Sequence, residues 1–153
     1  MTNRRSSRAV AVGWVLSLCA LSLVLLVSCS RKGDYPSPAS AGLDAVVDAH
    51  SLQPGVPRFF TYRHRSKEIN FFVIHHDGKV LSFLDACVTC YRSRLGYHFS
   101  EGTFTCRDCN MKYSTPEIEK GFGGCFPIRV PGTLRDGKYY IPRAVLEKAA
   151  KYF

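Results

Sequence analysis

The chain has 153 residues and a formal net charge of +9 at pH 7, which is enough sequence for one domain with a modest core once an N-terminal leader is removed. Its lysines and arginines are scattered, and no basic run accompanies a recognition helix, so we expect no nucleic acid partner. A hydrolase or nucleotide enzyme is disfavoured, because no phosphate-binding glycine loop, nucleophile elbow or His-Glu-x-x-His helix is present.

The first segment has the form of an export signal. Arg4, Arg5 and Arg8 precede an apolar stretch over Ala9–Val27, and Cys29 stands where that stretch stops. This end resembles the lipobox at which a bacterial signal peptidase cuts and leaves a lipidated cysteine. A transmembrane anchor is the alternative, since about 19 apolar residues can span a bilayer. We predict a lipoprotein signal peptide over residues 1–28 and a protein held by lipid on Cys29 at the extracytoplasmic face of a bacterial membrane, in the cell envelope.

Residues 29–57 are expected to form a lipidated tether between the anchor and the folded domain. Pro36, Pro38, Gly33 and Gly42 interrupt regular structure in this segment. The pattern over Leu43–His50 predicts one short amphipathic helix within it.

A β-hairpin is expected at the start of the folded domain, which we place over residues 58–153. The pair Asp77-Gly78 is a strong hairpin turn between two strand-like runs. This hairpin delivers Cys87 and Cys90 at its end. The strand-like runs in this part of the chain are Phe59–Arg63, Ile69–Ile74 and Val80–Leu84.

A second hairpin is predicted from Gly96–Phe99 and Phe104–Cys106, and it delivers Cys106 and Cys109. The elements after it are a short helix near Pro116 capped by Ser114 or Thr115, an extended segment over Cys125–Val130, a turn at Arg135–Lys138 and a C-terminal helix that begins at Pro142, with Val145, Leu146, Ala149 and Phe153 on one face. The sequence thus predicts a small β-rich α+β domain of hairpins around a cysteine-ligated metal centre, with a C-terminal helix.

Five thiols remain for the folded domain once Cys19 leaves with the signal and Cys29 takes lipid. An exported compartment favours disulfides, but five is an odd number and vicinal Cys-x-x-Cys pairs close very small loops. A metal site is therefore preferred, dithiol redox chemistry comes second and structural disulfides come third. The five candidate ligands are Cys87, Cys90, Cys106, Cys109 and Cys125.

The cysteine spacing is compatible with several metals. Zinc and mononuclear iron both use two Cys-x-x-Cys pairs, whereas iron–sulfur clusters usually have three cysteines close together in sequence. Copper prefers soft ligands, to which Met111 and His98 would contribute, although His98 is more simply an exposed strand residue. Cys125 exceeds the needs of a tetrahedral site. We favour it as a ligand, with a buried core cysteine as the alternative.

Four short motifs occur in order along the folded domain. They are Asp85-Ala86-Cys87-x-x-Cys90, Gly96-Tyr97, Cys106-Arg107-x-Cys109-Asn110 and Gly123-Gly124-Cys125-x-Pro127. Together they resemble the FtrD-like membrane iron–sulfur family over roughly Phe59 to Phe153, with Phe126 where that family is expected to have asparagine. The resemblance implies an iron–sulfur or related metal centre on the outer side of a membrane, moving electrons or iron beside a ferrous-iron transport system. Many relatives carry the domain behind membrane helices, which the expected lipid anchor replaces here.

The resulting functional prediction is a membrane-anchored extracytoplasmic iron–sulfur or iron protein for electron transfer or iron handling linked to iron uptake. An iron–sulfur cluster is the expected cofactor, and mononuclear iron, zinc and copper are the alternatives. We expect an electron carrier or metal-binding protein with a redox or iron-transport partner, more than a stand-alone enzyme. The alternatives are a structural-zinc module that binds a partner protein and a thiol- or copper-handling redox protein.

Overall fold

The computed structural model of the protein describes residues 35–153. The predicted signal peptide, the lipidation site Cys29 and the beginning of the predicted tether therefore lie outside the described residues. Within residues 35–153, no helix combines the length and the apolar character that a membrane crossing requires.

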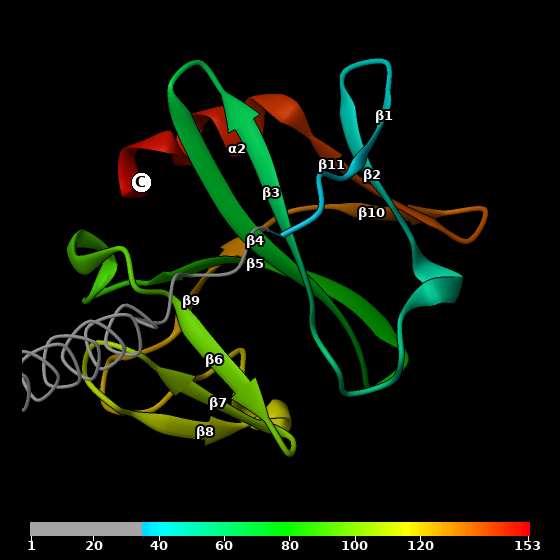
Figure 1. Cartoon of the computed structure of the whole chain (residues 1–153). Coiled ribbons are helices and arrows are strands. Elements are labelled where there is room, and N and C mark those ends of the chain that lie inside the picture. The colour runs from blue at the N-terminus through cyan, green and yellow to red at the C-terminus, as the bar shows by residue number, and fades with distance from the viewer. Residues whose placement is uncertain (1–34) are drawn as a thin grey trace, which may run out of the picture. The chain divides into compact units, whose positions relative to one another are not determined.

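Three antiparallel sheets and a short C-terminal helix make up the domain (Figure 1). The first sheet has the order β1 (Ala39–Ala41), β2 (Asp44–Asp48), β11 (Lys138–Pro142) and β10 (Thr133–Arg135). The second has the order β3 (Arg58–His64), β4 (Lys67–His76), β5 (Lys79–Cys87) and β9 (Pro127–Val130). The third has the order β6 (Tyr97–Ser100), β7 (Thr103–Cys106) and β8 (Lys112–Ser114). The predicted α+β class is confirmed.

Helical structure is short throughout the described chain. Helix α2 (Arg143–Lys148) continues into the 3-10 turn η4 (Ala149–Tyr152) and buries Leu146, Ala149 and Phe153, as the sequence predicts. The helix expected near Pro116 is a 3-10 turn, in which Glu117 and Ser114 form a capping box. This turn is η3 (Thr115–Glu117), and the remaining 3-10 turns of the described chain are η1 (Ala49–Ser51) and η2 (Tyr91–Ser93).

The hairpin of β4 and β5 is the centre of the domain. Asp77 and Gly78 both have positive φ angles, 50° and 70°, as a two-residue hairpin turn requires, and this predicted turn is confirmed. Side chains alternate between the two faces of a strand, so each face of the hairpin packs into a different core. Within β4, Phe71 and Val73 enter one core while Phe72 and Ile74 enter the other.

The first core lies between the central sheet, the β1-β2-β11-β10 sheet and the C-terminal helix. All its buried members except the Tyr139 hydroxyl are hydrocarbon, and that hydroxyl lies 3.1 Å from the Ser82 hydroxyl. Its buried residues are Ala45, Val47, Leu52, Phe60, Ile69, Phe71, Val73, Leu84, Ala86, Val130, Tyr139, Ile141, Leu146, Ala149 and Phe153.

The second core lies between the opposite face of the central sheet and the β6-β7-β8 sheet. It is rich in aromatic rings, and the Phe72 and Phe104 rings stack with centroids 5.3 Å apart across the two sheets. It also contains three of the five thiols. Its buried residues are Phe72, Ile74, Leu81, Phe83, Cys87, Tyr97, Phe104, Cys106, Tyr113, Ile118 and Cys125.

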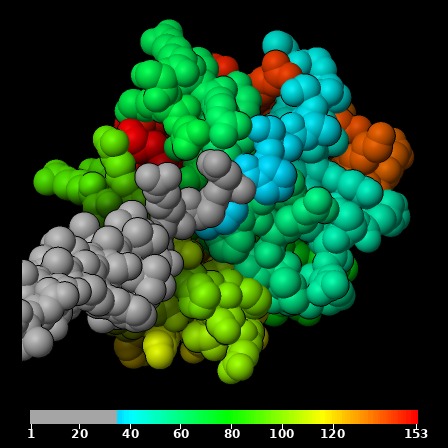
Figure 2. Space-filling model, viewed as in Figure 1, coloured from blue at the N-terminus to red at the C-terminus, as the bar shows by residue number. Residues whose placement is uncertain are grey.

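The helix predicted over Leu43–His50 is wrong, because strand β2 occupies most of this segment. Val46 pairs with Tyr140 of β11, and Val46 and Val47 are both buried. Burial on both faces removes the alternation that marks a strand in sequence. The predicted tether is also too long, because Leu52 belongs to the first core. Figure 2 shows residues 39–50, in cyan, packed onto the rest of the domain.

Candidate metal centre

The first Cys-x-x-Cys pair follows directly from the central hairpin. Cys87 is the last residue of β5 and, by strand alternation, shares its face with Phe83 of the second core. Strand β9 pairs beside this end of β5, with Cys87 opposite Pro127 and the Val88 N–H donating to the Phe126 carbonyl at 3.0 Å. This pairing brings Cys125, two residues before β9, next to Cys87.

The second pair lies at the end of the small sheet. Cys106 ends β7, and the chain then turns back so that the Asn110 N–H donates to the Cys106 carbonyl at 2.9 Å. Asn110 has a φ of 56°, the left-handed conformation that asparagine tolerates better than most residues. The turn carries Cys109 back over Cys106, so both thiols of the pair face one point.

A buried carboxylate ties the two hairpins together. Asp85 is 1% exposed, and its Oδ1 accepts a hydrogen bond from the Tyr97 N–H at 2.7 Å. Gly96 permits this approach, because a Cβ at that position would lie 2.4 Å from Asp85 Oδ1. The Gly96 carbonyl in turn accepts from the Arg107 N–H at 3.0 Å. The resemblance motifs include Asp85, Gly96 and Tyr97, but their role in joining the hairpins is visible only in the structure.

All five predicted thiols are brought into one cluster. Two groups of three sulfurs have all members within 4.8 Å of one another, and both groups contain Cys106. Cys125 Sγ connects them, at 3.2 Å from Cys87 Sγ and 3.6 Å from Cys109 Sγ. The two groups are Cys87, Cys90 and Cys106, and Cys106, Cys109 and Cys125.

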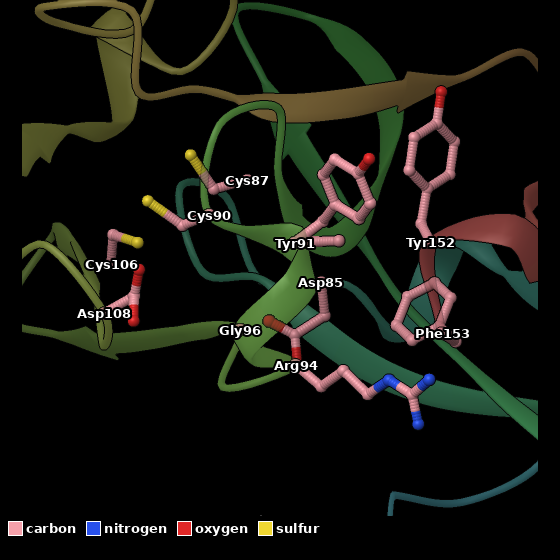
Figure 3. Close-up of a pocket in the computed structure, with 11 residues that line it drawn as sticks. Asp85, Cys87, Cys90, Tyr91, Arg94, Gly96, Cys106, Asp108, Tyr152 and Phe153 are labelled. Atoms are coloured by element: carbon pink, nitrogen blue, oxygen red, sulfur yellow. The ribbon is translucent and has the colours of Figure 1, made fainter.

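Exposure differs within each pair. The leading cysteines, Cys87 and Cys106, are buried, as is Cys125, whereas Cys90 is half-buried and Cys109 is exposed. Figure 3 shows the Cys87 and Cys90 sulfurs pointing toward the side from which Cys106 approaches. The cluster therefore has one side embedded in the aromatic core and one side that reaches solvent.

The thiols differ in how easily they ionise, because hydrogen bonds and burial act on them to different extents. Burial opposes ionisation of Cys87, but bonds from Thr89, Cys125 and the backbone N–H groups of Thr89 and Cys90 outweigh it and lower the pKa of Cys87 to about 6. Burial raises the pKa of the Cys125 thiol. Backbone donors to sulfur are typical of thiolate metal sites, whose electronic properties they tune.

Two hydroxyl groups beside the sulfurs have no counterpart among the sequence-based predictions. The Thr89 hydroxyl lies 3.3 Å from Cys87 Sγ and 3.5 Å from Cys90 Sγ. The Tyr97 hydroxyl lies 3.9 Å from Cys125 Sγ. Thr89 stands inside the Cys-x-x-Cys motif, which is a usable signal, whereas the position of Tyr97 depends on the packing of β6.

The other candidate ligands stay outside the cluster. His98 lies on the exposed side of β6 and belongs to neither group of three ligands, as expected for a solvated strand histidine. Met111 is half-buried and packs against the second core. The structure therefore places sulfur from cysteine alone at the centre of the site.

The donor set fits a thiophilic metal. Four thiolates at about 2.3 Å from one tetrahedral ion stand about 3.8 Å apart, close to the separations of these sulfurs. An iron–sulfur cluster also takes four cysteine thiolates and places further iron and sulfide between them, so it would hold the sulfurs farther apart. Magnesium and calcium are excluded as residents, because they require oxygen ligands. Zinc, mononuclear iron and an iron–sulfur cluster all match this chemistry.

A small cavity of about 10 Å³ adjoins the sulfurs on the side of the C-terminal helix (Figure 3). Asp85, Arg94 and Tyr152 contribute to its walls together with Cys87 and Cys90. It has room for about one water molecule and none for an organic substrate.

Comparison with known families identifies a matching family model. The model described as membrane iron-sulfur containing protein FtrD-like matches residues 52–153, more than half of the chain, and its range includes all five clustered cysteines. No curated protein and no solved structure matches the chain.

Proposed function

The chain belongs to the FtrD-like membrane iron–sulfur family, and from this premise we propose that its five-cysteine cluster holds an iron centre that transfers electrons. The observation that carries the proposal is the convergence of five thiols with no histidine or carboxylate among them. A metal whose coordination positions are all filled by thiolates has no position left at which a substrate would bind. Such a site suits electron transfer better than catalysis.

The burial of the cluster also supports electron transfer. The aromatic core around Cys87 and Cys125 excludes water from one side, and Cys109 reaches the surface on the other. Iron bound there would cycle between the ferric and ferrous states as one electron enters from a reduced partner and leaves to an oxidised one. No atom is transferred, so the small volume of the cavity beside the sulfurs is consistent with this role.

We place the protein at the outer face of a bacterial membrane, with a role in electron supply or iron handling for iron uptake. The support is the apolar run over Ala9–Val27 followed by Cys29, together with the word membrane in the description of the family. Replacement of Cys29 by serine should abolish lipidation, which incorporation of labelled fatty acid into the protein in growing cells measures. Absence of label in the wild-type protein, or equal labelling of Cys29→Ser, would contradict the lipid anchor.

Reductive titration of the full chain, purified without air, tests the proposed electron transfer. The oxidised protein should absorb visible light through sulfur-to-iron charge transfer, and this absorbance should bleach as electrons are added and return on oxidation. Iron together with acid-labile sulfide would identify a cluster, whereas iron without sulfide would identify a mononuclear site. A folded, colourless protein without iron would refute the proposal.

A structural zinc site is the second candidate, because the sulfur separations match a single tetrahedral ion without rearrangement. In that case the metal would stabilise the hairpins and a surface of the domain would bind a partner protein. The same purification distinguishes the two candidates. Zinc in a colourless protein that unfolds with a chelator would favour the structural site.

A further inference from the structure

Packing alone does not explain why two buried residues beside the sulfur cluster are tyrosines. Tyr97 is 0% exposed and Tyr113 is 3% exposed, and both belong to the second core. Their rings lie edge to face, with centroids 6.0 Å apart. Phenylalanine fills neighbouring positions of this core, as Phe104 does, so the hydroxyl groups must be explained separately.

The hydroxyl of Tyr97 points at the cluster. Its oxygen lies 3.9 Å from Cys125 Sγ, within reach of an O–H···S hydrogen bond. The buried hydroxyl of Tyr113 interacts with the hydroxyl of Tyr97, which also interacts with the Cys87 thiol. Two phenols and one thiol thus form a short polar row inside an aromatic core.

A buried hydroxyl without a partner is unfavourable by roughly 1–3 kcal/mol, so buried phenols beside a thiolate are stabilised when they donate to it. Burial raises the pKa of both phenols, and they stay protonated as hydrogen-bond donors. A metal-bound thiolate carries negative charge and no proton, so it can only accept. Cys125 is the thiolate that Tyr97 faces, and low polarity around the pair strengthens such a bond.

We propose that Tyr97 donates a hydrogen bond to Cys125 in the metal-loaded protein and thereby raises the reduction potential of the centre, with Tyr113 orienting the Tyr97 hydroxyl. The inference rests on the proposed function in one respect, namely that the centre is redox-active. A donor to sulfur withdraws charge from the ligand and favours the reduced, more negative state. Tyr97 is therefore a positioning residue that acts on the metal through Cys125.

Replacement of Tyr97 by phenylalanine tests the potential directly, since it removes the oxygen and keeps the ring. In an optical redox titration of the full chain, Tyr97→Phe should shift the midpoint potential to a more negative value, and Tyr113→Phe should shift it less in the same direction. Tyr139→Phe is the matched control, because Tyr139 is a buried tyrosine of the first core whose hydroxyl meets Ser82. It should leave the potential unchanged.

Cobalt substitution separates this inference from the proposed function. Cobalt(II) bound to thiolates has a sulfur-to-metal charge-transfer band, and loss of the donor in Tyr97→Phe should move this band to lower energy whatever the native metal is. An unchanged band would overturn the hydrogen bond even if the iron protein is redox-active. A shifted band in a protein whose native centre does not titrate would support the hydrogen bond and refute electron transfer. A shifted band with an unchanged potential would overturn the tuning.

Discussion

The two faces of the β4–β5 hairpin lead into cores that are held together in different ways. On one face, Phe71 and Val73 pack among hydrocarbon side chains that are closed off by the C-terminal helix. On the other face, Phe72 and Ile74 pack toward a small three-stranded sheet whose far end carries thiols. The first core is stabilised by burial of apolar surface, whereas the second ends in a cluster of thiols suited to bind a metal. One hairpin thus joins the candidate metal site to an apolar core.

The largest effect should come from removing the sulfur shared by both ligand groups. Cys106→Ser should lower the metal affinity by more than the roughly 10–100-fold that is typical of changes outside the ligand set. The purified variant should therefore contain less metal than the wild type. Metal analysis of the purified variant, compared with wild type, measures this. Full metal content in Cys106→Ser would show that the other four thiols suffice and that Cys106 is not a required ligand.

Removal of the metal should affect the two cores unequally. After chelation under reducing conditions, we expect faster amide hydrogen exchange in β6, β7 and β8, while β2, β11 and α2 keep their protection. Hydrogen exchange read by mass spectrometry resolves these segments. Equal loss of protection in both cores would show that the domain folds only as one metal-dependent unit.

A cavity in the first core should weaken the scaffold and spare the metal site. Phe71→Ala should reduce the free energy of unfolding by about 3–5 kcal/mol, because Phe71 is fully buried. The absorbance of the bound metal should stay as in wild type at temperatures where the variant is folded. Phe99→Ala, at a half-buried ring of the other core, is the control and should be less destabilising in urea denaturation.

The smallest of these effects concerns the link between the two hairpins. Asp85→Ala removes the acceptor of the Tyr97 N–H and should reduce the free energy of unfolding by about 2 kcal/mol. The exposed Glu68, paired with Arg63, provides the control, and Glu68→Ala should change stability by no more than about 0.5 kcal/mol. If urea denaturation gave the same loss in free energy of unfolding for Asp85→Ala and Glu68→Ala, the hydrogen bond between Asp85 and Tyr97 would not be what joins the two hairpins.

The sequence predicts the parts of this domain that are set locally. The Asp77-Gly78 turn fixes a hairpin by itself, and the two Cys-x-x-Cys spacings identify the candidate thiols. Strand β2 was missed because its partner β11 lies far away in the chain and both its faces are covered. The tyrosines were missed for a similar reason. Nothing near Tyr97 in sequence shows that its hydroxyl will face Cys125, because that contact depends on how two sheets pack.

X-ray absorption at the iron edge of the full chain, purified without air, is the most direct measurement of the central claim that these cysteines form an iron–thiolate centre. The account predicts iron in the preparation with a first coordination shell made of sulfur alone. A first shell with substantial nitrogen or oxygen, or a folded preparation without iron, would contradict it.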